Sequence, residues 1–223
     1  MCKKIIAVTG PSCAGKTTIT QKIFKEYGFV IPRHTTTRAP RCDDTVGFYR
    51  HITFEEFNVY LREDKFLIAS SDGVRGYGIL KSDCEDAWCF SDTIILNVSY
   101  KDIQQLNLLP YKVQVVVLTF KDIVDGIKAR MTKLSDRLHS PEDVDYRIES
   151  AQKDCEQYFS ALKKYATVIA YTDTMSESET YSFVTKALKL EHDFSETIDE
   201  SAQMNETNFS LHKPTMEAEL DLE

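Results

Sequence analysis

A glycine-rich stretch near the start of the chain limits what it can fold into more than any other feature. Residues 10–17 read Gly-Pro-Ser-Cys-Ala-Gly-Lys-Thr, directly after the apolar run 5–8 and before a segment, 17–27, with apolar residues at helical spacing. Glycines let backbone N–H groups crowd around a polyphosphate, and the start of a helix adds the positive end of its dipole. The sequence therefore predicts a strand, a phosphate-binding loop and a helix, in that order.

This loop matches the Walker A pattern G-x4-G-K-T. We expect Lys16 to reach the β- and γ-phosphate oxygens of ATP and the hydroxyl of Thr17 to be a ligand of Mg²⁺. A small residue suffices at Cys13, and a redox-sensitive thiol among N–H donors is the alternative interpretation. The expected ATP-binding residues are Gly10, Ser12, Cys13, Ala14, Gly15, Lys16, Thr17 and Thr18.

Further strands and helices alternate along the chain. Apolar runs at 93–98, 113–118 and 168–171 are typical of buried strands, and helical patterns are found at 122–131, 142–164 and 180–190. Thr53, three residues before Glu56, predicts a capping box that begins another helix. Alternation of this kind predicts an α/β fold with a central parallel sheet. Residues 33–50 have little periodicity, and we expect an extended, solvent-facing segment there.

Charge divides the chain into a domain and a tail. The net charge is −8, but ten acidic residues and only one basic residue follow position 190, so residues 1–190 have a net charge of +1. We expect one domain over 1–190 and a disordered acidic tail over 191–223. We expect neither a nucleic acid nor a membrane as partner, since there is no spanning apolar run. Six scattered cysteines indicate free thiols, and we expect a cytoplasmic protein.

Two arginines after the loop and its helix indicate a site for a second phosphate. Arg38 and Arg41 lie three residues apart on a chain stiffened by Pro40, and Tyr49 follows. Two guanidinium groups at this spacing can close on one phosphate, and a tyrosine hydroxyl can add a third donor. This pattern favours a kinase whose acceptor is itself phosphorylated.

These motifs resemble the guanylate kinase family over about residues 3–190. The resemblance depends on the glycine-rich loop, the segment 34–49, Phe54-Glu-Glu-Phe57, Gly76-Tyr77-Gly78 and the later helix that includes Arg147. It implies a P-loop NTPase three-layer fold with an acceptor-binding insertion over 33–81 and a lid over about 126–147. The implied acceptor-binding residues are His34, Thr35, Arg38, Arg41, Tyr49 and Tyr77, and the implied catalytic residues are Lys16, Arg130, Arg137 and Arg147.

The chain departs from the family pattern where guanine would be bound. Ile68 stands where the family has a glutamate, Ile79 where it has a small hydroxyl residue, and His34 where it has a serine. The family's Asp-x-Asp is Asn97-Val98-Ser99 here. At these positions the chain resembles the ribose 1,5-bisphosphate phosphokinases, which also have an asparagine and a serine in this strand, like Asn97 and Ser99, and an aliphatic residue where Ile79 stands. Those enzymes lack the Arg-x-Pro-Arg segment.

Three hypotheses follow from these patterns. The leading one is phosphoryl transfer from MgATP to a small phosphorylated acceptor, most simply a nucleoside monophosphate, with the base left open. The second keeps this mechanism and replaces the acceptor by a sugar phosphate. The third is a guanylate-kinase-like module that binds a protein and has weak catalysis or none, against which the intact loop with Lys16 and Thr17 argues. The oligomeric state is left open.

Overall fold

A computed structural model of the chain describes residues 3–40, 44, 47–71, 73–133 and 141–190. These residues belong to one compact unit, Met1–Leu190. The tail predicted over 191–223 lies outside the described residues, as do Arg41, Arg137 and part of the predicted lid. No helix in the described part is long and apolar enough to cross a membrane.

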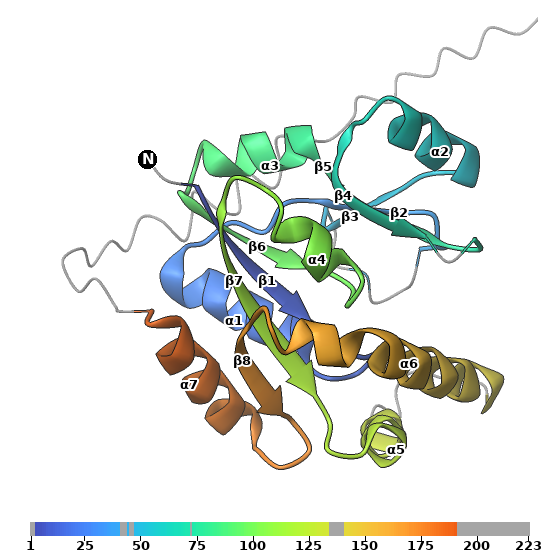
Figure 1. Ribbon diagram of the computed structural model, residues 1–223, viewed down its shortest axis with the longest axis vertical. Helices are drawn as coiled ribbons and strands as arrows, with labels where there is room; N and C mark the ends of the chain where they lie inside the picture. The colour runs from blue at the N-terminus through green and yellow to red at the C-terminus, as the bar shows by residue number, and fades with distance from the viewer. Residues whose placement is uncertain (1–2, 41–43, 45–46, 72, 134–140, 191–223) are drawn as a thin grey trace, which may run out of the picture. The chain divides into compact units, whose positions relative to one another are not determined.

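The central sheet is formed by four parallel strands in the order β6, β1, β7, β8 (Figure 1). The strands are β1 (Lys4–Thr9), β6 (Thr93–Asn97), β7 (Lys112–Thr119) and β8 (Ala166–Tyr171). They confirm the four strands expected from the apolar runs. A sheet buried on both faces explains why those runs are almost continuously apolar.

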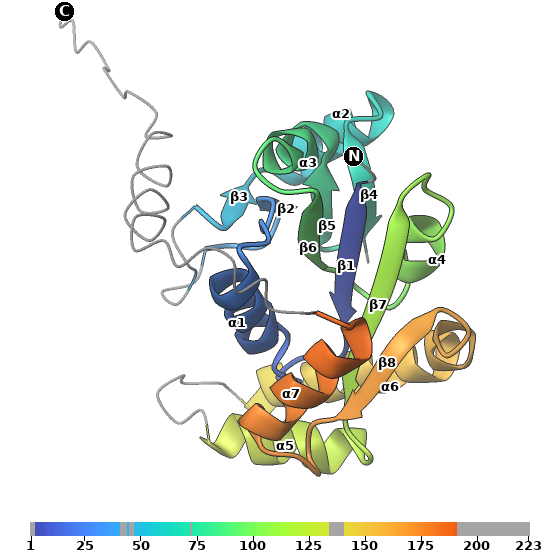
Figure 2. The same ribbon diagram turned by 90° about the vertical axis from the view of Figure 1, so that its left-hand side faces the viewer.

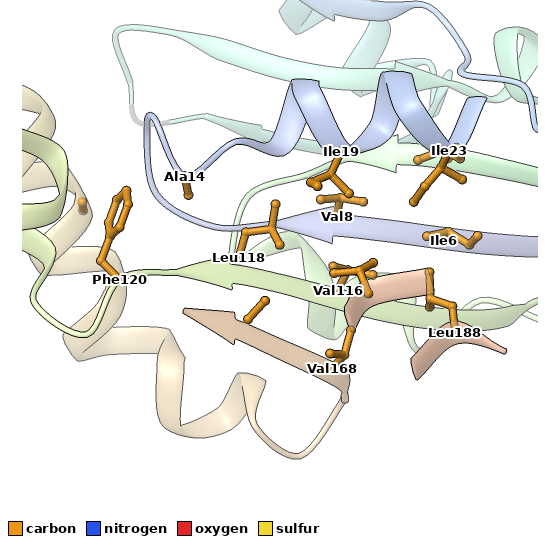
Figure 3. Packing of buried hydrophobic residues seen from close by; sticks show 14 of the residues in the cluster. Ile6, Val8, Ala14, Ile19, Ile23, Val116, Leu118, Phe120, Val168 and Leu188 are labelled. Atoms are coloured by element: carbon orange, nitrogen blue, oxygen red, sulfur yellow. The ribbon is translucent and has the colours of Figure 1, made fainter. Parts of the chain in front are cut away.

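Helices cover both faces of this sheet (Figure 2). Ile6 and Val8 of β1 pack with residues of α1 (Lys16–Tyr27) and α7 (Glu177–Leu188), as Figure 3 shows. Ile5 and Ala7 point to the opposite face, where they join a second cluster with residues of α3 (Lys81–Trp88) and α4 (Asp102–Leu106). The predicted three-layer α/β fold is confirmed.

The next two helices, α5 (Ile123–Lys133) and α6 (Pro141–Leu162), follow β7 in the chain. Helix α5 packs Ile127 and Met131 into the cluster that contains α1. Helix α6 contributes Ile148 and Ala151 to the same cluster, whereas its last residue, Leu162, belongs to the cluster on the other face. Helix α6 therefore contacts both clusters.

A second, smaller sheet has the order β3, β2, β5, β4. Its strands are β2 (His34–Thr36), β3 (Tyr49–His51), β4 (Phe66–Ser71) and β5 (Gly76–Leu80), and α2 (Phe54–Arg62) begins at the predicted capping box of Thr53 and Glu56. Phe57, Phe66 and Leu80 form its small core. The expectation of a solvent-facing segment at 33–50 was wrong for 34–36, because these residues form an inner strand and are buried.

Candidate active site

One large cavity connects the glycine-rich loop to the second sheet. Its volume is about 830 Å³. It is lined by the loop after β1, by β2, β4 and β5, by the residues that follow β6, and by one side of α6. Cavities of this size accommodate a nucleotide. Of the predicted site residues, Gly10, Ser12, Lys16, His34, Thr35, Arg38, Tyr49, Tyr77 and Arg147 line it.

The backbone of the loop requires glycine at its first position. Gly10 has a φ of 146°, and a Cβ atom there would lie 1.9 Å from the carbonyl oxygen of Leu118 in β7. Gly15, with a φ of 90°, is the N-cap residue of α1, and no side chain caps this helix. The N–H groups of its first turn are thus left for a ligand, as in other anion sites at helix starts.

Lys16 folds back onto the loop. Its Nζ donates to the carbonyl oxygens of Gly10 at 2.8 Å and of Pro11 at 2.7 Å. Burial lowers the pKa of Lys16 from 10.5 to about 8; the neighbouring Arg147 also lowers it, and Cys13 acts in the opposite direction. A polyphosphate bound at the loop would restore the charged form by offering it anionic partners.

Cys13 has a backbone conformation that residues other than glycine rarely adopt, so small size alone does not describe what this position requires. Its φ is 65°, which is the left-handed region favoured by glycine. Its Sγ lies 3.7 Å from the hydroxyl of Ser12, and the thiol is half-buried. All four cysteines in the described ranges are free thiols.

Two of the three arginines predicted to be catalytic lie in the described part of the chain, and their surroundings differ. Arg147 of α6 donates to the hydroxyl of Ser12 at 2.8 Å, so the fold brings it to the loop. Arg130 of α5 donates to the carbonyl oxygen of Thr172 at 2.9 Å, and it is not among the residues that line the cavity. Arg137 lies outside the described residues.

Arg38 is buried and paired with a carboxylate on the acceptor side of the cavity. Its guanidinium group donates to both oxygens of Asp44, one bond being 2.8 Å, and lies 4.6 Å from the centre of the Tyr49 ring. Burial raises the pKa of Tyr49, whereas Arg38 lowers it. Tyr77 is 40% exposed and lines the same cavity, so three of the predicted phosphate-binding side chains meet here. Arg41, the fourth, lies outside the described residues.

The residues that depart from the family pattern lie next to one another. Ile79 of β5 is the register partner of Ile68 in β4 and of His34 in β2, and both isoleucines are almost fully buried. Nε2 of His34 lies 3.2 Å from the main-chain nitrogen of Asn97 and 3.1 Å from its carbonyl oxygen. One continuous part of the cavity wall is therefore formed by four of the five departing residues, His34, Ile68, Ile79 and Asn97, and the fifth, Ser99, lines the same cavity.

His34 is uncharged over the ordinary pH range. Burial lowers its pKa from 6.5 to about 4, and the hydrogen bond with Asn97 offsets only part of this effect. Its ring stacks on that of Phe48 at 4.9 Å between centroids. Together with Ile68 and Ile79, it gives the cavity an apolar and neutral wall at this place.

The sequence analysis missed a polar group in the same cavity. Ser70 of β4 and Ser99 and Asp102 after β6 all line it, and Asp102 is buried. Ser99 and Asp102 have the spacing of a capping box, but the N-cap residue of α4 is Lys101 and no side-chain cap is formed there. Nothing in the sequence indicates that Ser70 lies beside them, because this contact joins residues 29 positions apart.

A glycine-rich loop between the first strand of a parallel sheet and a helix, with Lys16 directed at the loop, defines a P-loop nucleotide-binding fold. The family model described as guanylate kinase matches residues 2–170. This chain belongs to the guanylate kinase family.

Individual relatives agree with this assignment. The chain is similar to a guanylate kinase of Synechocystis sp., with 24% identity over 177 residues, which are 72% of this chain and 92% of the relative. It is 31% identical over 108 residues to a guanylate kinase of Fusobacterium nucleatum, where the match spans 48% of this chain and just over half, 58%, of the relative. A crystal structure of guanylate kinase from Anaplasma phagocytophilum has a TM-score of 0.62, with 14% identity and coverage of 93% of this chain and 96% of that one. Family membership supports nucleoside monophosphate kinase activity in general and leaves the base open.

Proposed function

We propose that this chain transfers the γ-phosphoryl group of ATP to the phosphate of a small acceptor, a nucleoside monophosphate. The supporting observation is that one cavity is lined both by Lys16 and Arg147 at the glycine-rich loop and by Arg38, Tyr49 and Tyr77 at the second sheet. Phosphoryl transfer depends on holding donor and acceptor oxygens in line and on neutralising the charge between them. One cavity with cationic groups at the loop and at the second sheet meets this requirement.

Each side chain would act by position and charge, and no protein nucleophile is needed. Lys16 would leave the two loop carbonyls and bind the β- and γ-phosphate oxygens. Arg147, held on Ser12, would stabilise the charge that develops on the transferring group. Arg130 and Arg137 are proposed for the same role, and Arg130 would first have to release the carbonyl of Thr172.

The residues present are suited to Mg²⁺ as the cofactor of ATP. Mg²⁺ takes few protein ligands and keeps waters and phosphate oxygens in its shell. Thr17 is exposed at the start of α1, and Oδ1 of Asn97, in the cavity wall, is buried without a hydrogen-bond partner among the described residues. When bound, the ion would shield the charge of the phosphates. Thr17 would hold it, and Asn97 could accept a hydrogen bond from one of its waters.

We further propose that GMP is not the preferred acceptor. Guanine presents N–H donors that need acceptors, and leaving them unpaired in a buried site costs about 1–3 kcal/mol each. Here Ile68 and Ile79 replace the residues that would meet them, and both are almost fully buried. A sugar phosphate is the second candidate, favoured by the hydroxyl groups of Ser70 and Ser99 in the same wall.

A panel of acceptors tests the proposal. The protein is incubated with MgATP and each nucleoside monophosphate, each 2′-deoxynucleotide or ribose 1,5-bisphosphate, and the formation of ADP is measured. We expect turnover with at least one nucleoside monophosphate, a slower rate with GMP, and loss of turnover in Lys16→Ala. Turnover with ribose 1,5-bisphosphate alone would favour the sugar phosphate. If no acceptor is phosphorylated, the kinase proposal is wrong, and a protein-binding role becomes the better explanation.

A further inference from the structure

Asp102 is a buried carboxylate in the wall of the acceptor cavity. It is 7% exposed and is the first residue of α4, which follows β6 after the short connection 98–101. Its Oδ2 accepts from the main-chain nitrogen of Ser99 at 2.9 Å and from the Ser99 hydroxyl at 2.7 Å. The hydroxyl of Ser70 lies 3.5 Å from that of Ser99, so β4 also contributes to this group.

Capping of α4 does not account for the burial of this side chain, because Asp102 is the first helical residue and the N-cap residue, Lys101, has no side-chain cap bond. A cap functions equally well in water, as the exposed capping boxes of α2 and α7 show in this chain. Burial of a carboxylate is costly unless it is paired. Within the described ranges Asp102 has no ion pair closer than 4 Å, and burial raises its pKa, an effect that Ser99 and Ser70 only partly oppose.

Asp102 also has acceptor capacity left for a ligand. An ionised carboxylate has about four lone-pair sites. Ser99 occupies two of them and Ser70 at most one. The other carboxylates that line the cavity, Glu149 and Asp154 of α6, are exposed and half-buried respectively. Among these lining carboxylates, Asp102 is therefore the one that is buried away from water.

The apolar wall beside this group limits what the acceptor can present there. Ile68 and Ile79 offer no hydrogen-bond acceptor, and His34 is already engaged with Asn97. A donor on the acceptor molecule, beyond its phosphate, would be left unpaired against the side chains of Ile68 and Ile79. At Asp102 the same donor meets a carboxylate with a free lone pair.

We propose that Asp102, positioned by Ser99 and Ser70, binds a neutral hydrogen-bond donor of the acceptor, a sugar hydroxyl or a base N–H group, and so determines which acceptor is used. This inference rests on the proposed kinase function. The preference of the family for guanine would thus be replaced by a contact from a different position in the chain, on the helix that follows β6.

Asp102→Asn tests the inference, because it keeps the size of the side chain while it removes the charge and replaces one acceptor oxygen by a donor. We expect the acceptor KM to rise roughly 10- to 100-fold, as for the loss of a hydrogen bond to a charged group, with the KM for ATP within about twofold of wild type. The matched control is Asp83→Asn. Asp83 pairs with Arg50 at 2.7 and 3.0 Å and does not line the cavity, so this variant should leave both KM values unchanged.

The choice of acceptors separates the two sources of the donor. If a sugar hydroxyl is bound, the acceptor KM of the wild type is lower for a ribonucleotide than for its 2′-deoxy analogue. Asp102→Asn then removes this difference in KM. If a base N–H is bound, Asp102→Asn instead removes the difference in acceptor KM between nucleotides with different bases.

Calorimetric titration with the preferred nucleotide measures its affinity directly, and a thermal melt shows whether each variant is folded. If Asp102→Asn destabilises the fold, Ser99→Ala is the second variant, because it keeps the carboxylate and removes one of its donors. We expect Ser99→Ala to shift the acceptor KM in the same direction by a smaller factor.

Two results would overturn the inference, and they can be told apart from failure of the kinase proposal. Equal changes in the KM for ATP and for the acceptor would mean that Asp102 only stabilises the turn between Ser99 and α4. An unchanged acceptor KM and unchanged selectivity in a folded Asp102→Asn protein would also contradict it. If the wild type phosphorylates nothing and binds no acceptor, the proposed function fails first and the inference falls with it.

Discussion

The guanidinium group of Arg38 holds the carboxylate of Asp44 by two hydrogen bonds, in the geometry that a planar arginine uses for a phosphate. Nε2 of His51 lies 3.3 Å from the same carboxylate, and the ring of Tyr49 lies against Arg38. An acceptor phosphate that binds Arg38 with both of its terminal nitrogens must therefore replace Asp44. The carboxylate of Asp44 therefore occupies the two Arg38 donors that we propose for the acceptor phosphate.

Asp44→Asn is expected to lower the acceptor KM several-fold, because a neutral amide competes less well with a phosphate for Arg38. Steady-state kinetics with the preferred acceptor measure the effect, and the KM for ATP in the same experiment is the internal control. A higher acceptor KM in Asp44→Asn would show that Asp44 orients Arg38 and does not compete with the substrate.

The affinity for ATP should fall as the pH rises through 8. Lys16 has a pKa of about 8 in the free protein, and a bound polyphosphate raises it, so binding takes up a proton above this pH. Between pH 8 and pH 9 we expect about a five- to tenfold loss of affinity, measured by calorimetric titration. His34, with a pKa of about 4, does not titrate in this range. A flat profile from pH 7 to pH 9 would contradict the assignment of Lys16.

Two substitutions in the loop are expected to change stability with opposite signs. Gly10→Ala places a Cβ atom against the Leu118 carbonyl at an unfavourable φ, so the free energy of unfolding should fall by about 2 kcal/mol or more. Cys13→Gly removes a side chain from a φ of 65° and should raise it by up to about 1 kcal/mol. Urea unfolding measures both. Equal destabilisation by the two variants would mean that the loop has a different backbone in solution.

The pair Ile68→Glu and Ile79→Ser tests whether these positions exclude GMP. Together they reinstate the residue types of the family, so we expect GMP turnover to rise relative to other nucleotides. A buried glutamate should at the same time cost about 2–4 kcal/mol of stability. The double variant Ile68→Leu and Ile79→Val keeps the wall apolar and serves as the control. If the control gains as much GMP activity, the two positions do not discriminate against guanine.

The central fold was predictable because long, regular patterns specify it. The runs that became β1, β6, β7 and β8 are apolar on both faces, and the capping box at Thr53 is a local signal that needs no tertiary contact. The three-residue strands β2 and β3 were missed because so short a segment has no measurable periodicity. The burial of β2 depends on pairing with β5, which is far away along the chain, since Thr36 pairs with Tyr77.

Part of the candidate site was predictable for a different reason. Lys16, Arg147, Arg38, Tyr49 and Tyr77 were found because motifs specify them, and all five line the cavity. The positive φ of Cys13 and the pairing of Arg38 with Asp44 could not be found in this way, since backbone angles and ion-pair partners are decided by the folded chain.

Phosphorus-31 NMR of a reaction with MgATP and the preferred nucleoside monophosphate tests the central claim most directly. We expect the γ-phosphate signal of ATP to decrease while an acceptor diphosphate and ADP form in equal amounts, and we expect Arg38→Ala to slow this reaction far more at low acceptor concentration than at saturation. Formation of ADP and inorganic phosphate, with the acceptor unchanged, would show that the loop hydrolyses ATP and that the cavity does not join it to an acceptor phosphate.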